Sequence, residues 1–273
     1  MQLKQYKFHY HLNRKTDQKL ILFLHGFMGD RNEFNSAIAF LDPDYSYLTI
    51  DLPGHGKTQV LGSEEYYNMP NTAQGVINLL DELKIDNCYL VGYSMGGRLA
   101  LYLALHYPER FDKVVLESAS PGLLSQAEKD EREQKDNGIA RKLERIKTKE
   151  EFICFLSNWY SQNIFGNIKN HPEFDQLITM RSHNNPQELA KSLRFLGTGC
   201  QPSLWEKLRE NQTPILLLAG EYDTKFRVIN QQMANICNFC QLKIVSNAAH
   251  NTHLENTRKF IQNLDNFIES NIS

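Results

Sequence analysis

The chain has 273 residues, enough for one large domain to bury a core without disulfides. Its hydrophobic content of 41% exceeds that of disordered chains, and its net charge of -2 favours neither nucleic acid nor an anionic membrane as a partner. The longest apolar stretch, Leu99–Leu105, is far shorter than the ~20 residues that span a bilayer. We therefore expect a globular protein with no membrane span.

The N-terminal residues 1–15 lack the apolar segment of a secretory signal, and five cysteines cannot all form pairs. Both features predict a reducing, cytoplasmic location. Cys237 and Cys240 form a C-x-x-C pair, but a zinc site needs two further ligands and a redox site needs its own strand and helix context. We interpret them as thiols without a chemical role and expect neither a metal nor another cofactor.

Short apolar runs alternate along the chain with segments of helical periodicity. The runs predict strands at Lys19–Leu24, Tyr47–Ile50, Cys88–Val91, Lys113–Leu116, Ile215–Ala219 and Leu242–Val245. The periodic segments predict helices at Thr72–Leu83, Gly96–His106, Val228–Cys237 and Leu254–Ile268. This alternation predicts an α/β fold, with a mostly parallel sheet covered by helices on both faces.

The alternation stops between Pro121 and Gln212, where no apolar strand is evident. Helix-start signals occur there instead, with Ser125, Thr148 and Asn185 each followed by an acid three residues later. Strand signals resume after residue 213. We therefore predict a core formed by residues 1–120 and 206–273, with residues 121–205 inserted as a helical cap.

The motif Gly92-Tyr93-Ser94-Met95-Gly96 lies between a predicted strand and a predicted helix. In that context G-x-S-x-G is typical of a nucleophile elbow, in which small neighbours allow a strained turn that exposes the serine hydroxyl. A serine needs a histidine to take its proton, and the histidine needs an acid to fix its tautomer. Ser94 is therefore the first member of a predicted catalytic triad.

Asp223 and His250 follow predicted strands, and they come after Ser94 in the chain order of the α/β-hydrolase fold. Glu221 is an alternative acid, although it directly follows the turn glycine. His253 is an alternative base, although it falls at the start of the last predicted helix, where polar residues often face solvent. We prefer Asp223 and His250.

Developing negative charge requires hydrogen-bond donors, which this fold supplies from the backbone. We expect an oxyanion hole from the N–H groups of Met95 and of Phe27, which follows the first apolar strand. Arg98 lies four residues after Ser94 and shares its helix face. A guanidinium there needs an anion, either a protein carboxylate or a carboxylate of the substrate.

Five segments resemble 2-succinyl-6-hydroxy-2,4-cyclohexadiene-1-carboxylate synthases, which are α/β-hydrolase-fold lyases of menaquinone and phylloquinone biosynthesis. The resemblance covers about residues 19–268, and residue 249 departs from it, with alanine where glycine is common before the histidine. The segments are Gly92–Arg98, Ser118–Leu123, Met180–Pro186, Gly197–Trp205 and Gly220–Phe226.

The resemblance implies that the chain eliminates pyruvate from 2-succinyl-5-enolpyruvyl-6-hydroxy-3-cyclohexene-1-carboxylate, a tricarboxylate, with the triad acting as a proton-abstracting base. It also implies substrate binding by five residues, namely Arg98, Arg132, Arg181, Tyr93 and Trp159. Arg132 could instead lie on a solvated helix face, and Arg181 and Trp159 could pack within the cap. The alternative functions are a serine hydrolase of esters or carbon–carbon bonds in acidic substrates, and a non-catalytic binding protein of the same fold.

Overall fold

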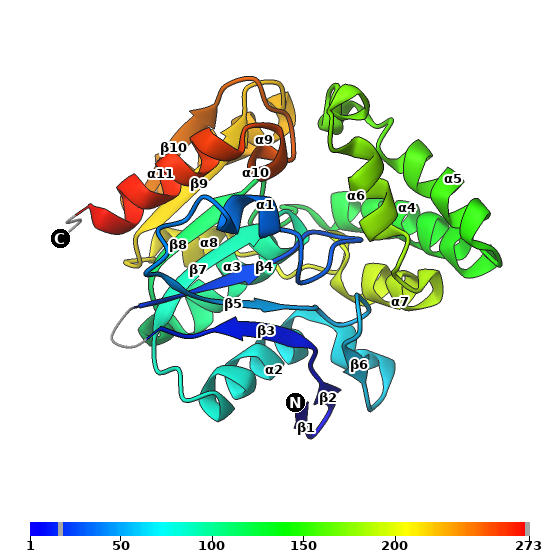
Figure 1. Cartoon of the computed structure of the whole chain (residues 1–273), viewed down its shortest axis with the longest axis horizontal. Helices are drawn as coiled ribbons and strands as arrows, with labels where there is room; N and C mark the ends of the chain where they lie inside the picture. Colours follow the sequence, from blue (N-terminus) through cyan, green and yellow to red (C-terminus); the bar gives the residue numbers. More distant parts are fainter. Residues whose placement is uncertain (16–18, 271–273) are drawn as a thin grey trace.

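A seven-stranded sheet forms the centre of the protein (Figure 1), whose computed structural model describes residues 1–15 and 19–270. The strand order is β10-β9-β8-β7-β4-β5-β3, and all neighbours are parallel except β3 and β5. The strands are β3 (Tyr10–Asn13), β4 (Leu20–Leu24), β5 (Ser46–Ile50), β7 (Cys88–Tyr93), β8 (Phe111–Glu117), β9 (Ile215–Gly220) and β10 (Cys240–Val245).

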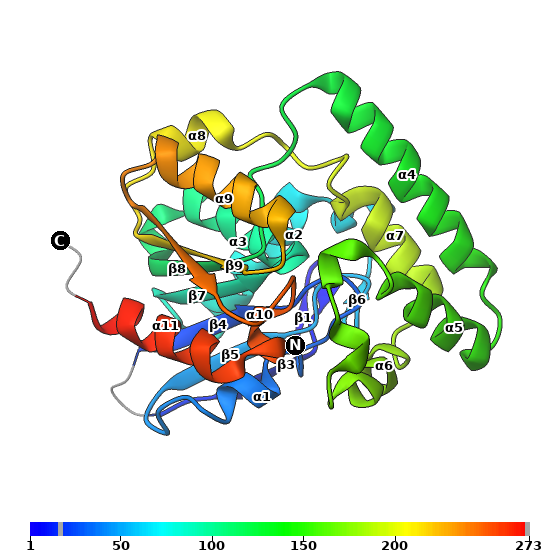
Figure 2. The same ribbon diagram turned by 90° about the horizontal axis from the view of Figure 1, so that it is seen from above.

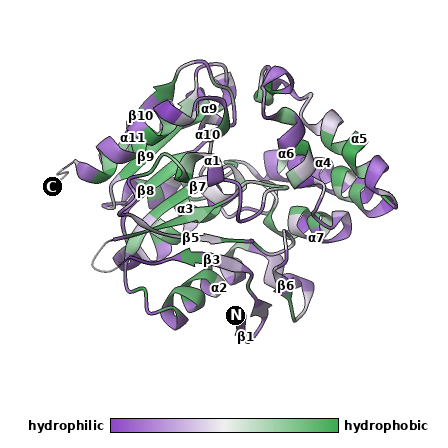
Figure 3. Cartoon of the chain, in the orientation of Figure 1, coloured by the Kyte–Doolittle hydropathy of each residue, from purple (hydrophilic) through white to green (hydrophobic). Residues whose placement is uncertain are grey.

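The predicted α/β fold and all six predicted strands are confirmed. The strands inside the sheet carry apolar residues (Figure 3) and are mostly buried, whereas β10 lies at an edge of the sheet and leaves Ile244 exposed. Four N-terminal strands were missed. Three of them form a small antiparallel sheet, β1 (Gln2–Leu3), β2 (Tyr6–Lys7) and β6 (Gln59–Val60). The fourth, β3, is an edge strand whose residues are only partly buried, so it carries no apolar run.

Helices cover both faces of the sheet (Figure 2). On one face, α2 (Met69–Glu82), α3 (Met95–His106), α8 (Trp205–Arg209) and α9 (Thr224–Ile236) bury the larger apolar core. On the other face, α1 (Asn35–Ile38) and α11 (Thr257–Glu269) cover a second core. The last predicted helix is in fact two, α10 (Thr252–Glu255) and α11, because Asn256 leaves helical geometry and caps α11 by accepting from the Lys259 N–H.

Between β8 and β9 the chain forms helices and no strand, as predicted for residues 121–212. Besides α8, the α-helices there are α4 (Gln126–Arg145), α5 (Lys149–Trp159), α6 (Phe174–Arg181) and α7 (Pro186–Leu196). Ser125 and Thr148 form the two predicted capping boxes, and the Asn185 side chain accepts from two N–H groups of α7. These helices share an apolar cluster that includes Leu143, Phe152 and Leu156.

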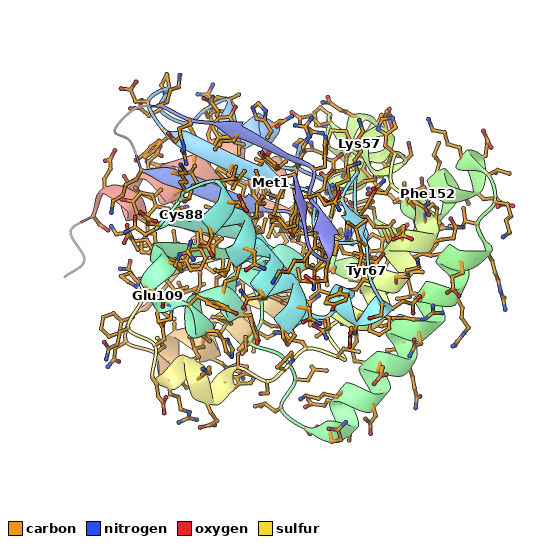
Figure 4. All side chains as sticks on the ribbon, turned by 90° about the horizontal axis from the view of Figure 1, so that it is seen from below. Met1, Lys57, Tyr67, Cys88, Glu109 and Phe152 are labelled. Atoms are coloured by element: carbon orange, nitrogen blue, oxygen red, sulfur yellow. The ribbon has the colours of Figure 1, made fainter. Side chains whose placement is uncertain are left out.

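Specific contacts seat these helices, referred to below as the cap, on the sheet domain. The Asn184 amide donates to the Met28 carbonyl at 2.7 Å and accepts from the Gly56 N–H at 2.7 Å. The Tyr67 hydroxyl bonds Glu188 of α7, and Tyr67 lies where the two parts meet (Figure 4). Among the described residues, no helix combines the length and the apolar character needed to cross a membrane.

Gly96 lies where α3 crosses β4 with almost no separation. A Cβ at this position would lie 2.2 Å from the Leu24 carbonyl oxygen and 2.5 Å from that of His25. We predict that Gly96→Ala lowers the free energy of unfolding by about 3 kcal/mol, measured by urea denaturation, because backbone atoms cannot move aside. Gly138 of α4 is the matched control, since its nearest such neighbour lies 3.9 Å away. Gly138→Ala should raise stability by about 0.5–1 kcal/mol, and equal effects at both positions would contradict the prediction.

Candidate active site

Ser94 occupies a strained turn between β7 and α3. Its φ of 50° and ψ of -106° lie in a region that few residues other than glycine adopt. A Cβ on Gly92 would lie 2.5 Å from the Gly96 carbonyl oxygen, so this turn closes only around small neighbours. The geometry is that of a nucleophile elbow, with the serine at the carboxyl end of a central strand and at the N-terminus of a helix.

The structure brings Ser94, His250 and Asp223 together from three separate strand ends. His250 Nε2 lies 3.0 Å from Ser94 Oγ, and His250 Nδ1 lies 2.7 Å from Asp223 Oδ2. Asp223 also caps α9, since its Oδ1 accepts from the Phe226 N–H at 3.1 Å. With both the histidine and the aspartate buried, this chain of contacts can draw the proton from the serine hydroxyl and orient the imidazole.

The loop that carries His250 is held by Glu255, which sequence reasoning missed, and by Tyr93. The Glu255 carboxylate accepts from the N–H groups of Ala249 and Asn251, each at 3.1 Å, and so binds the backbone on both sides of His250. Burial raises the pKa of Glu255 to about 7. The Tyr93 hydroxyl donates to Asn251 Oδ1 at 2.6 Å. The backbone N–H of Ala249, where glycine is common in the family that the chain resembles, therefore has a hydrogen-bond acceptor in Glu255.

The two alternative triad members lie elsewhere. Glu221 is exposed and accepts from the Asn247 N–H. His253 does not face solvent, as its place in the sequence suggested, but is buried between two carboxylates. Its Nδ1 lies 2.7 Å from Glu117 Oε2, and its Nε2 lies 3.2 Å from Glu33 Oε1. The expectation of solvent exposure is corrected because these acids compensate for the burial of the ring.

A cavity of about 590 Å³ lies between the sheet domain and the cap, with Ser94 and His250 in its wall. Phe27 and Met95, the expected oxyanion donors, also line it. Met95 is the first residue of α3, so its N–H points from a helix N-terminus, where backbone donors and the helix dipole favour negative charge. The aromatic side chains of Tyr93 and Trp159 form part of the cavity wall. The Trp159 ring packs edge-on against the Phe27 ring, with the ring centroids 5.6 Å apart.

Arg98 lines the cavity without a carboxylate partner. Its guanidinium donates to the Leu196 carbonyl at 2.9 Å and to Gln201 Oε1 at 3.3 Å, both of which are neutral acceptors. No acid lies within ion-pair distance of it in the parts of the chain that the structure describes. Burial and the neighbouring Arg132 lower the pKa of Arg98 to about 10, and the attraction of Asp136 offsets this effect only in part.

The two cap arginines differ in position. Arg132 of α4 lines the cavity and forms an ion pair with Asp136, with Nε and Oδ1 2.8 Å apart. Arg181 is not among the residues that line the cavity, so its predicted role in substrate binding stays a prediction. It is buried and bonds Glu33 and the Tyr160 hydroxyl, because a buried guanidinium requires an acid and this one is supplied by the protein.

Lys225 was also missed, although it lies within the segment Gly220–Phe226 on which the resemblance rests. It lines the cavity two residues after Asp223. A surface lysine at the start of a helix carries no sequence signal of its own. Only the position of α4 across the cavity distinguishes it from other lysines.

Comparison with known proteins agrees with this geometry. The family model described as alpha/beta hydrolase fold matches residues 19–257, so the chain belongs to that fold family. A Bacillus subtilis relative named "Putative 2-succinyl-6-hydroxy-2,4-cyclohexadiene-1-carboxylate synthase" is 36% identical over 92% of this chain and 90% of its own length. A synthase of the same name from Serratia proteamaculans is 32% identical over 93% and 94%.

Among solved structures, MenH from S. aureus superposes with a TM-score of 0.87 and 34% identity over 98% of both chains. Within the hydrolase fold, the chain therefore belongs to the family of 2-succinyl-6-hydroxy-2,4-cyclohexadiene-1-carboxylate synthases. The resemblance that five sequence segments indicated is confirmed at the level of the family.

The charged surroundings of His253 predict an unusual titration. Burial alone would lower its pKa, but attraction and hydrogen bonds from Glu117 and Glu33 outweigh burial and raise the pKa to about 9. Because this value exceeds the unfolded value of about 6.5, the protonated ring stabilises the fold fully below pH ~6.5, and this contribution is lost as pH rises through about 9.

Proton NMR titration of the imidazole signals checks this prediction, with His253→Gln used for assignment. His55 serves as an internal comparison, because burial holds its pKa well below the ordinary value. A His253 signal that titrates at or below pH 6.5 would contradict the ion-pair account.

Proposed function

We propose that the protein is a carbon–oxygen lyase that eliminates pyruvate from 2-succinyl-5-enolpyruvyl-6-hydroxy-3-cyclohexene-1-carboxylate and forms 2-succinyl-6-hydroxy-2,4-cyclohexadiene-1-carboxylate. The observation that carries the proposal is an assembled Ser94–His250–Asp223 triad facing a cavity that also contains the unpaired cation of Arg98. Family membership supports it as well. This activity belongs to menaquinone or phylloquinone biosynthesis, and the cytoplasmic location stays a prediction.

The first step of the proposed mechanism is proton transfer. His250 Nε2 takes the Ser94 hydroxyl proton across 3.0 Å, while Asp223 holds the imidazole by its other nitrogen. The serine oxygen then removes the acidic ring proton beside the succinyl carbonyl. The backbone N–H groups of Phe27 and Met95 stabilise the negative charge that develops on that carbonyl oxygen.

The second step breaks the bond to the leaving group. The electron pair released from the ring C–H bond moves through the ring double bond and expels the enolpyruvyl oxygen, so a second ring double bond forms as the C–O bond breaks. The enolate of pyruvate departs and is protonated to pyruvate. No electrons enter or leave the system, so these residues need no redox cofactor for the elimination.

Arg98, Arg132, Tyr93 and Trp159 are proposed to bind the substrate. Arg98 is the strongest candidate, because its buried charge has only neutral acceptors and a substrate carboxylate would complete its coordination. Residues of the cap and of the sheet domain together line the cavity around Ser94, and exclusion of water from it would favour elimination over hydrolysis. A serine hydrolase would use the same triad, but a small neutral ester would leave the guanidinium unpaired.

We predict that Ser94→Ala abolishes pyruvate release, because the variant lacks the oxygen that accepts the ring proton. The assay incubates purified protein with the enolpyruvyl substrate and couples pyruvate to lactate dehydrogenase. Hydrolysis of a 4-nitrophenyl ester is followed in parallel. Ester turnover without pyruvate would support the hydrolase, absence of both activities would support a binding protein, and substantial pyruvate release by the variant would remove serine from the role of base.

Arg98→Ala should lower kcat/KM for pyruvate release by roughly 100-fold or more, since a charge-assisted bond to a substrate carboxylate is lost. The fold should persist, because the lost contacts are two hydrogen bonds to neutral acceptors. Arg209→Ala is the matched control, as that guanidinium is exposed on α8 and pairs only with exposed Glu206. Near-normal kinetics of the Arg98 variant would show that no carboxylate binds there.

A further inference from the structure

More basic than acidic side chains line the active-site cavity. Its cations are Arg98, Arg132, Lys135 and Lys225, and its acids are Glu128, Glu131 and Asp136. Each acid already has a partner, either a basic residue of α4 or the Ser125 residue that caps the N-terminus of α4. Asp136 binds Arg132, Glu131 binds Lys135, and Glu128 closes the capping box with Ser125. Arg98 and Lys225 therefore form no ion pair within the described residues, while Glu128 bonds the neutral Ser125 and keeps its own charge.

Lys225 lies on the opposite side of the cavity from the cap helix. It is the second residue of α9, and its ammonium group is influenced by Arg132, Lys135 and Asp136 of α4 and by Asp223. In the described part of the chain no carboxylate lies within ion-pair distance of it. Lys225 as a whole is exposed, but partial burial of its ammonium group and the neighbouring Arg132 lower its pKa against the attraction of Asp223 and Asp136. An anion bound between α9 and α4 would relieve the repulsion from Arg132.

The number of carboxylates in the proposed substrate makes this second cation significant. The resemblance implied three arginines for a tricarboxylate, but Arg181 is buried against Glu33 and is not among the residues that line the cavity. Arg132 is partly neutralised by Asp136. Lys225 is the remaining cation of the cavity wall that has no acid.

We propose that Lys225 binds a carboxylate of the substrate at the α9 side of the cavity, while Arg98 binds another beside Ser94. This inference rests on the proposed function and adds a residue that determines specificity for polycarboxylates. Lys225 touches the bound anion and takes no part in proton transfer. Its loss should therefore act on binding, as an increase in KM with little change in kcat.

Kinetics of three variants test the proposal. Lys225→Ala should raise KM for the enolpyruvyl substrate by about 10-fold or more and leave kcat within about twofold. Lys225→Arg should restore most of the affinity, because it returns the charge. Lys243→Ala is the matched control, since that lysine is exposed on β10 and lies outside the cavity, and its KM should equal that of the wild type. Circular dichroism and thermal melting verify the fold of each variant.

Calorimetry separates binding from chemistry. The Ser94→Ala variant is titrated with the intact substrate, which it cannot convert. The same titration is made with the double variant that carries both Ser94→Ala and Lys225→Ala. The double variant should bind about 10-fold more weakly or worse. If the wild type releases pyruvate but Lys225→Ala leaves both KM and this affinity unchanged, the inference is overturned and the proposed function stands. If the wild type releases no pyruvate and Ser94→Ala binds no substrate, the proposed function itself fails.

Discussion

The contact between His250 Nε2 and Ser94 Oγ is the interaction on which the candidate site depends. It joins residues 156 positions apart, and it forms because β7, β9 and β10 are parallel and end at the same edge of the sheet. The strained turn positions the Ser94 hydroxyl for this contact, and the Asp223 carboxylate orients the His250 ring through its other nitrogen. Glu255 contributes from outside the triad, by holding the backbone on both sides of the histidine.

Two buried arginines show how the same side chain acquires different roles. Arg181 has an acid of the protein beside it, and its charge is used to join the cap to the sheet domain through Glu33. Arg98 has only a carbonyl and an amide oxygen, so its charge remains available to a ligand in the cavity. The residue type is identical, and the position of the nearest carboxylate makes the difference.

The cap and the sheet domain share one polar network. Glu33 binds Arg181 of the cap and His253 of the sheet domain, and His253 also binds Glu117 at the end of β8. Glu117 in turn accepts from the Thr252 hydroxyl, just after the loop of the catalytic histidine. Displacement of the cap would therefore disturb charges that lie close to His250. A continuous chain of polar contacts thus runs from Arg181 of the cap to Thr252, two residues after His250.

The sequence by itself determined the sheet core, the helical insertion and the three triad positions, because these depend on local signals. Short apolar runs bounded by turn residues, such as Ile215–Ala219, predict strands, and Ser94 needs its small neighbours directly beside it in the chain. The edge strand β3 was missed because half-exposed residues carry no such run. The tertiary structure alone decided that Arg181 meets Glu33, that His253 lies between two acids and that Lys225 faces α4. Each of these outcomes depends on the charges that distant segments bring near, and no local pattern specifies them.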